Sequence, residues 1–311
     1  MAGPTSSTVR FLHAAVLVLI ALGGAGLAAA ADRQHNPIQR PELTRRADGA
    51  LRPVVDQMAI ELSTAEDALS ELSLDGRNVL GRLQVLDLLA TEEAIAEGEV
   101  PAAAVAQAGD RLRTLVADAA GIVEPWRLGE ATVAQLEAVE RASLAAVAVD
   151  DDWVGLAAHA RRVAGLVGML REHDDRVFDA TSAGRQAEWD NALGLLDQAR
   201  SEIVDATMAR DELAASGKVA TLDDLLSRYR AYDAALVALY QHMRDGGQQS
   251  GPEFEVLEEQ VAQAQAVLPA DDAVLSVVVG ETAGPVIAAG LVALDEAHGR
   301  VNAALELVSG S

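Results

Sequence analysis

Apolar residues recur at alternating steps of three and four along most of the chain beyond Pro53. This spacing places apolar side chains on one face of an α-helix, and a sustained series is typical of the seam of a coiled coil or helical bundle. The first series predicts one continuous helix that begins near Pro53, a residue that suits a first helical turn. Its members are Val55, Met58, Leu62, Ala65, Leu69, Leu72, Gly76, Val79, Leu83, Leu86 and Ala90.

Interruptions of the pattern predict where the other helices begin and end, mostly at glycine and proline. The aspartates at 150–152 predict the start of a helix, because negative charge is favourable at a helix N-terminus. Thr221 with Asp224 resembles a capping box. The first break is expected at Glu97, Gly98 and Pro101, and the later helices are expected near 105–122, 130–149, 150–177, 185–214, 221–243, 252–268 and 291–308.

Composition agrees with this helical pattern. Half of the residues are apolar, mostly Ala, Val and Leu, and only 3% are aromatic. Ala, Leu, Glu and Arg lose little freedom in helices, whereas sheet proteins use more aromatic and β-branched residues. We therefore predict an all-α fold, an elongated multi-helix bundle with coiled-coil-like heptad packing over residues 53–311, with a possible boundary near 125–130.

The N-terminus carries a long apolar run, Phe11–Ala31, that contains no Asp, Glu, Lys or Arg. Such a run can cross a hydrocarbon layer of about 30 Å, and its alanine-rich end also suits signal peptidase. Residues 1–31 are therefore expected to be a cleaved signal peptide or an uncleaved anchor, followed by a Pro/Arg-rich linker at 32–52. The expected location is the cell membrane with the bundle outside the cytoplasm, or secretion, although the arginines after the run favour the opposite orientation.

A second apolar stretch covers residues 273–294 and has Glu281 as its one charged residue. Thr282, Gly284 and Pro285 follow Glu281 in the middle of the stretch. A carboxylate in mid-membrane is costly, and proline removes a backbone hydrogen bond. The stretch is interpreted as a buried helix or helical hairpin, with a second membrane span as the open alternative.

Charge and cysteine content limit the possible partners. The formal net charge is −24, which argues against nucleic acid, because phosphate binding needs basic surface. The chain has no cysteine, which rules out disulfides, thiolate metal sites and thiol nucleophiles. The remaining partners are the membrane through residues 1–31, another protein, or a second copy of the chain.

Short motifs that suggest chemistry have simpler explanations. Asp295–His298 reads DEAH, but no phosphate-binding loop exists and Lys218 is the only lysine. The box falls within a helical seam, so that it is interpreted as a chance match. Asp295 and His298 also form one Asp-x-x-His pair, and a single pair cannot build a two-metal bundle site.

Other candidate groups lie in or near the helical seams. The stretch "LREHDDR" at 170–176 is interpreted as a solvated or salt-bridged face with Asp174 on the seam, and metal binding by His173 is the alternative. His159 is two heptads away from His173, too far to chelate with it. Five aromatic residues could line a ligand pocket but are expected mainly in the core: Trp153, Trp189, Tyr229, Tyr232 and Tyr240. No catalytic, cofactor-binding or metal-binding residue is assigned, and we expect a protein that is not an enzyme.

Several stretches resemble an uncharacterised bacterial family of exported or membrane-anchored helical proteins. They are "ALSELSLDGRNVLGRLQVLDL", "HDDRVFDATSAGRQAEWDNALGLLDQA", "TLDDLLSRYRAYDAALVALY" and the glycine-bearing C-terminal helix, and together they span most of 68–305. The resemblance implies one N-terminal hydrophobic segment and a long helical region. It implies no activity, ligand or functional residue.

The sequence therefore favours a non-catalytic helical protein of the cell envelope that acts by protein–protein interaction or scaffolding. The alternative is a small-ligand binding or sensing ectodomain that works with a separate signalling partner.

Overall fold

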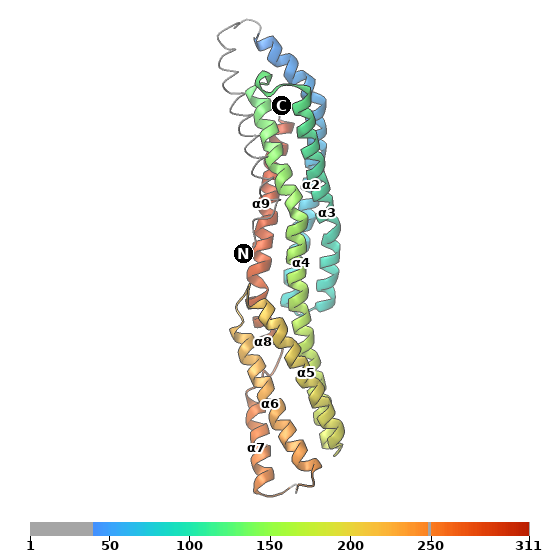
Figure 1. The fold of residues 1–311 in the computed structure, drawn as a ribbon, viewed down its shortest axis with the longest axis vertical. Helices are drawn as coiled ribbons and strands as arrows, with labels where there is room; N and C mark the ends of the chain where they lie inside the picture. Colours follow the sequence, from blue (N-terminus) through green and yellow to red (C-terminus); the bar gives the residue numbers. More distant parts are fainter. Residues whose placement is uncertain (1–39, 248–249, 311) are drawn as a thin grey trace, which may run out of the picture. The chain divides into compact units, whose positions relative to one another are not determined.

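Figure 1 shows the fold in the computed structural model, which describes residues 40–247 and 250–310. Within these ranges the chain is helical and has no β-strand, which confirms the all-α prediction. The predictions for residues 1–39 lie outside the described residues. The helices are α2 (Arg40–Gln84), α3 (Leu88–Ile122), the 3-10 helix η1 (Pro125–Arg127), α4 (Glu130–Arg185), α5 (Trp189–Leu213), α6 (Ala220–Arg244), α7 (Pro252–Ala266), α8 (Ala273–Thr282) and α9 (Gly284–Ser309).

Helix α2 begins well before the predicted start at Pro53. Residues 40–52, expected to be an extended linker, are helical, and Ala47 and Leu51 are buried. These two residues extend the apolar stripe toward the N-terminus. Their spacing indicates a helix, but the prolines and arginines of this region led to the prediction of a linker. Pro53 lies inside the helix, where it cannot donate to the carbonyl of Gly49. Gly49 is exposed, so that water can satisfy that carbonyl.

The first break in the helices occurs at residues 85–87 and not at Glu97–Pro101. Leu86 has a left-handed backbone with φ 60°, and the Ala90 amide donates to Asp87 Oδ1 at 3.1 Å, which caps the start of α3. Gly98 and Pro101 lie inside α3. The predicted helix across 53–90 was therefore wrong, because the Asp87 cap interrupts a stripe whose spacing continues through the turn.

Helix α4 is one continuous helix where two were predicted. The aspartates at 150–152 lie in its interior and are exposed, so that they do not begin a helix. The apolar stripe is buried on both sides of them, at Val149 and Trp153. Burial of this stripe holds the helix together through the acidic run.

Helices α5 and α6 bury the faces that their spacing predicts. In α5 these are Ala192, Leu196, Ala199, Ile203 and Ala206, and in α6 they include Leu222, Leu225, Tyr229, Tyr232, Leu236 and Met243. The capping box predicted at Thr221 and Asp224 does not form, because α6 begins after Val219 without a side-chain cap.

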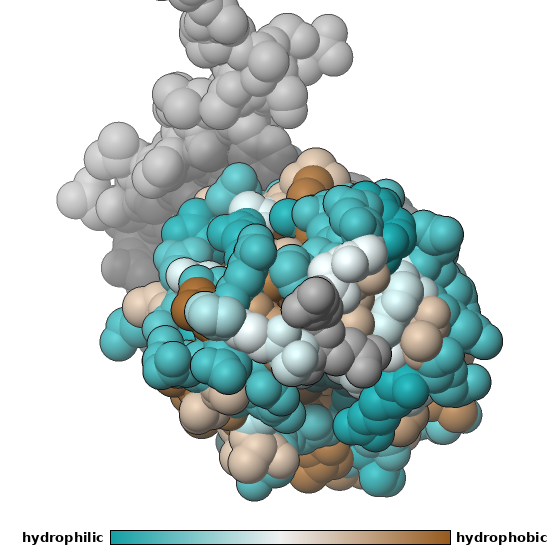
Figure 2. All heavy atoms as spheres, turned by 90° about the horizontal axis from the view of Figure 1, so that it is seen from below, coloured by the Kyte–Doolittle hydropathy of each residue, from teal (hydrophilic) through white to brown (hydrophobic). Residues whose placement is uncertain are grey.

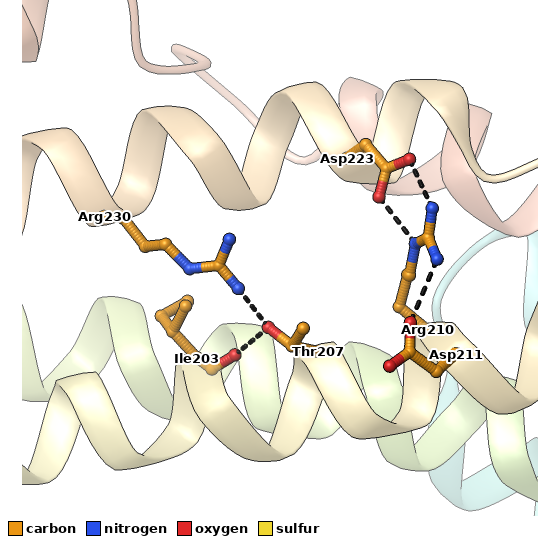
Figure 3. A network of polar contacts seen from close by, with 6 residues as sticks. All are labelled: Ile203, Thr207, Arg210, Asp211, Asp223 and Arg230. Carbon is orange, nitrogen blue, oxygen red and sulfur yellow. Dashed lines mark hydrogen bonds and ion pairs between the residues drawn. The ribbon is translucent and has the colours of Figure 1, made fainter.

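Polar contacts join α5 to α6 on their exposed side (Figure 3). Arg210 donates hydrogen bonds to both carboxylate oxygens of Asp223, with Nε–Oδ1 and Nη2–Oδ2 distances of 2.6 and 2.7 Å. It also donates to Asp211 Oδ1 at 3.0 Å. Arg210 lowers the pKa of Asp223 through these hydrogen bonds. Arg230 donates to the hydroxyl of Thr207. The contacts fix the hairpin at the end where the two helices connect.

The chain divides into two compact units. Among the described residues, unit 1 comprises 40–70, 103–149 and 296–310, and unit 2 comprises 71–102, 150–247 and 250–295. Both units therefore draw on α2, α3, α4 and α9. Residues 125–130, where the sequence suggested a boundary, lie inside unit 1.

Unit 1 is built from four helical segments whose contacts form a closed ring. Arg111 of α3 pairs with Glu61 of α2 at 3.3 Å, and Gly109 of α3 packs against Val147 of α4. Helix α4 contacts α9 through a Gln135 side chain that donates to the Leu307 carbonyl at 2.8 Å. Helix α9 returns to α2 where His298 approaches Glu66 at 3.5 Å.

Unit 2 packs aromatic rings against glycines. A Cβ added at Gly98 would lie 2.0 Å from the Trp153 ring, and one at Gly76 would lie 3.6 Å from the same ring. Trp153 is only 1% exposed, so that the ring needs this space. The two glycines let α2 and α3 approach α4 around a large buried side chain.

The apolar stretch at 273–294 forms α8 and the first part of α9. No single described helix is long and apolar enough to span a membrane, but α8 and α9, bent by 49° at Ala283, meet that criterion as a pair. In unit 2 this pair buries Leu275, Val278, Ile287 and Leu294. This burial agrees with the interpretation as core helices joined by a bend.

Seen from below the view of Figure 1, the described surface is mostly hydrophilic with small scattered apolar areas (Figure 2).

Candidate ligand pocket

A pocket of about 1000 Å³ lies in unit 2 among α4, α5, α6 and α7. Its wall combines apolar side chains with several aromatic rings and a few polar groups, the composition common in small-molecule sites. The lining residues are Asp174, Val177, Phe178, Thr181, Gly184, Arg185, Trp189, Tyr232, Leu236, Leu239, Tyr240, Met243, Phe254, Glu258, Val261, Ala262, Gln265 and Pro269.

Helix α7 forms the loosely packed wall of this pocket. It lies against α6, and its apolar face carries Phe254, Leu257, Val261 and Ala264, which are all only half-buried. No residue of α7 is fully buried. An apolar stripe that stays half-exposed leaves surface available for something else to cover.

The aromatic end of the pocket is fixed by a glycine contact. A Cβ added at Gly184 would lie 2.7 to 2.9 Å from the outer ring atoms of Tyr240. The Trp189 ring packs beside Tyr240, with centroids 5.8 Å apart. Gly184 thus allows the tip of Tyr240 to reach the last turn of α4, next to Arg185.

Two phenols and one guanidinium provide hydrogen-bond donors at this end, beside the indole of Trp189. Burial raises the pKa of Tyr240 to about 12, with a further increase from Tyr232 and a decrease from Arg185. Burial and the charge of Asp233 raise the pKa of Tyr232, and Arg185 again opposes them. Both phenols are therefore protonated at neutral pH, and both are close enough to Arg185 to experience its charge.

A buried charged cluster lies behind the opposite end of the pocket. His173 Nδ1 is 3.1 Å from Asp174 Oδ1, and its Nε2 is 3.1 Å from Asp233 Oδ1. Tyr229 donates its hydroxyl to Asp174 Oδ2 at 3.0 Å, and its ring lies 4.5 Å from the imidazole. The side chains of His173 and Asp233 are each only 1% exposed.

The geometry indicates that His173 is an imidazolium. Ionised carboxylates only accept hydrogen bonds, so that both ring nitrogens must donate. Burial alone would lower the pKa of His173, but the hydrogen bonds and charges of Asp174 and Asp233 outweigh it and raise the pKa to about 9. Both nitrogens are occupied, which leaves the ring unable to act as a base or a metal ligand in this arrangement.

Asp174 connects this cluster to the pocket. Its side chain is half-exposed and lines the large pocket as well as a smaller one of about 160 Å³. The smaller pocket also contacts Tyr229, Asp271 and Asp272. The pocket therefore has an acidic end near Asp174 and an end with aromatic and basic groups near Arg185.

The interpretation of residues 170–176 as a surface face was partly wrong. The seam passes through His173, which is buried, whereas Asp174, predicted on the seam, is exposed. The ion pairs of this stretch are present: Arg171 pairs with Asp272 at 3.0 Å and Arg176 with Glu172 at 3.4 Å. The buried partner, Asp233, follows Tyr232 on α6 and had no sequence signal other than its position beside a predicted seam.

The five candidate aromatic residues separate into two groups. Four of them are buried, as the core interpretation predicts: Trp153, Tyr229, Tyr232 and Tyr240. Tyr232 and Tyr240, together with half-buried Trp189, also line the pocket, which agrees with the ligand-site alternative. Trp153 is buried against glycines, and Tyr229 belongs to the His173 cluster.

The structure does not bring the other candidate residues into this pocket. Asp295 of the DEAH motif lies on α9 and pairs with Arg77 at 3.7 Å. His298 lies in unit 1, and Lys218 is exposed between α5 and α6. Buried His159 contacts the Thr282 carbonyl at 3.0 Å, and burial lowers its pKa. In the part of the chain that the structure describes, no three His, Cys, Asp or Glu residues are grouped so that they could hold a metal ion.

Comparisons with protein families, with curated proteins and with solved structures find no match to this chain.

Proposed function

We propose that the protein is a non-catalytic binding protein that holds a small ligand in the pocket among α4, α5, α6 and α7. The observation that carries this proposal is a pocket of about 1000 Å³ with aromatic residues in its wall, of which Trp189 and Phe254 are only half-buried. Binding pockets of drug-sized molecules commonly have volumes of roughly 300–1000 Å³ and such walls.

The arrangement of polar groups supports binding rather than catalysis. A catalytic base needs a free nitrogen or oxygen within reach of the substrate. Both nitrogens of His173 contact carboxylates, and both oxygens of Asp174 accept hydrogen bonds. These groups therefore stabilise the pocket wall and are not assigned a role in a reaction.

The proposal places this protein in the cell envelope. Residues 1–31 would direct the chain to the membrane as a signal peptide or anchor, and the bundle would lie outside the cytoplasm. Coiled-coil-like packing of the long helices and membership of the exported helical family belong to the same proposal. The three-four spacing supports the packing, and the quoted sequence stretches support the family.

Native mass spectrometry of the full chain purified from cells tests the ligand-binding proposal. The wild type is expected to carry a bound small molecule that dissociates on activation. Ala262→Trp places an indole in the pocket wall and should reduce the bound fraction at least severalfold.

Ala266→Trp is the matched control, because Ala266 lies on the same helix but does not line the pocket. It should retain the ligand. Equal ligand occupancy in both variants, or no bound molecule in the wild type and no binding of any added amphiphile, would contradict the proposal.

A scaffolding role is the second candidate function. Two apolar side chains, Val85 in the α2–α3 turn and Leu89 in the first turn of α3, are 70% and 74% exposed. Exposed apolar surface favours a protein contact where it is contiguous. Crosslinking in cells should capture a partner through this turn, and the double variant Val85→Ser/Leu89→Ser should lose it. A capture pattern that the double variant does not change would exclude this surface.

A further inference from the structure

The aromatic end of the pocket presents hydrogen-bond donors without acceptors. Arg185, Tyr232 and Tyr240 all line the pocket. Among residues 40–247 and 250–310, none of the three side chains donates a hydrogen bond or forms an ion pair. A guanidinium and two phenols that face one pocket can bind a group that only accepts hydrogen bonds, and a carboxylate matches a guanidinium especially well.

The carboxylates of the pocket wall do not satisfy these donors. Asp174 uses one oxygen for His173 and the other for Tyr229, and it lies near the opposite end of the pocket. Glu258 is exposed on α7. The positive charge of Arg185 acts on both phenols and opposes the increase in pKa that burial causes.

The rest of the wall favours a ligand with an apolar body. Most of its residues are apolar, among them Val177 of α4, Leu236 and Leu239 of α6, and Val261 and Ala262 of α7, with Thr181, Glu258 and Gln265 as polar members. Along α4, residues 177 and 185 are separated by roughly 12 Å at the usual helical rise. An alkyl chain or an aromatic group attached to an acid can cover this length.

We infer that the ligand is a carboxylate with an extended apolar body, whose acid group binds Arg185, Tyr232 and Tyr240 and whose body lies between α4, α6 and α7. This inference rests on the proposed ligand-binding function and names the chemical class. Arg185 determines the specificity for the acid group, because the apolar walls can accommodate many different apolar groups whereas the hydrogen-bond donors bind only an acceptor. The neighbouring carboxylates disfavour a ligand with a second negative charge.

Isothermal titration of the full chain with three ligands of equal chain length tests the class: decanoate, decylammonium and decanol, each below its micellar concentration. Decanoate is expected to bind most tightly. Titration with 4-phenylbutyrate then shows whether an alkyl or an aromatic body fits better, and tight binding of either acid supports the inference.

Substitutions test which residues bind the carboxylate of decanoate. Arg185→Gln should weaken decanoate binding roughly tenfold, the effect expected for one charged hydrogen bond. Tyr240→Phe and Tyr232→Phe keep the rings and should each weaken it about threefold, since each removes one neutral donor. Arg200→Gln is the matched control, because Arg200 is exposed on α5 outside the large pocket, and it should leave the affinity unchanged.

The results distinguish a failure of the carboxylate inference from a failure of the proposed ligand-binding function. Decylammonium or decanol that binds as tightly as decanoate, with Arg185→Gln unchanged, overturns the class but leaves the pocket as a ligand site. No binding of any of the four compounds overturns the class as well, and a ligand detected by native mass spectrometry would then still support the proposed function. Circular dichroism of each variant, with an unchanged melting temperature, ensures that affinity and not folding is measured.

Discussion

The two units place their buried charges differently. In unit 1, Glu61 is nearly buried but pairs with Arg111, whose side chain is 59% exposed and reaches solvent. In unit 2, His173 and Asp233 are both 1% exposed and contact each other at 3.1 Å. A pair that retains contact with water contributes little to stability, whereas a buried pair depends on every partner being present. Unit 2 is therefore the unit whose core can be altered by a single change of charge.

Removal of the Asp233 carboxylate is expected to have the largest effect. Asp233→Asn leaves the buried imidazolium with only Asp174 as an anionic partner, and loss of one partner of a buried ion pair typically costs about 4 kcal/mol. Urea unfolding followed by circular dichroism measures this change. The exposed neighbour of the cluster, Asp175, provides the control, and Asp175→Asn should leave the unfolding free energy nearly unchanged. Equal effects of both substitutions would contradict the buried pair.

The pH dependence of stability tests the charge on His173. Its pKa is about 9 in the folded protein, above the ordinary value of 6.5, so that the stabilisation is complete below pH 6.5 and is lost as pH rises through 9. The difference corresponds to a contribution on the order of 3 kcal/mol. His159 has the opposite sign, because its lowered pKa reduces stability as pH falls below 6.5.

The double variant His173→Gln/Asp233→Asn serves as the reference for this measurement. It should lose the decrease in unfolding free energy between pH 6.5 and 9. A wild-type protein with constant stability across this range would contradict the imidazolium assignment.

The next largest change in stability is expected from the contact between Gly98 and Trp153. Gly98→Ala adds a Cβ 2.0 Å from a ring that is buried, and the resulting overpacking should cost about 2 kcal/mol. Gly155 of α4 has nothing within 4 Å of its added Cβ. Gly155→Ala should therefore stabilise the protein by about 0.5 kcal/mol through its better helix propensity. Thermal unfolding distinguishes the two, and the same sign for both would refute the packing argument.

The smallest effect is expected in unit 1. Glu61→Gln removes the charge that pairs with exposed Arg111 but keeps a similar shape, and such pairs contribute less than about 1 kcal/mol. The effect should decrease further at high salt, because salt screens exposed charges. Urea unfolding at low and high salt measures it, and a loss as large as that of Asp233→Asn would remove the distinction between the units.

The helical architecture could be predicted from the sequence because apolar stripes repeat with the helical period. The same regularity concealed the boundaries: the stripe continues through the Asp87 cap and through Asp150–Asp152, so that spacing alone misplaced both breaks. The N-terminal extension of α2 was missed because prolines and arginines outweighed Ala47 and Leu51. Local composition cannot decide between a linker and a helix when packing against other helices determines the result.

The candidate site was only partly predictable. Trp189, Tyr232 and Tyr240 were predicted mainly as core residues, with ligand contact as the alternative, and their convergence depends on Gly184 and on the loose packing of α7. Burial of His173 with Asp233 is a contact between residues 60 positions apart in the chain. No local pattern specifies such a pair, because the partner is chosen by the register between α4 and α6.

Hydrogen–deuterium exchange of the full chain with and without decanoate tests the central claim, that unit 2 holds a ligand between α4, α6 and α7. The account predicts slower exchange in 174–185, 232–243 and 254–265, with the unit 1 segments 40–70 and 103–149 unchanged. Uniform protection of both units, or no protection in α6 and α7 at saturating decanoate, would contradict it.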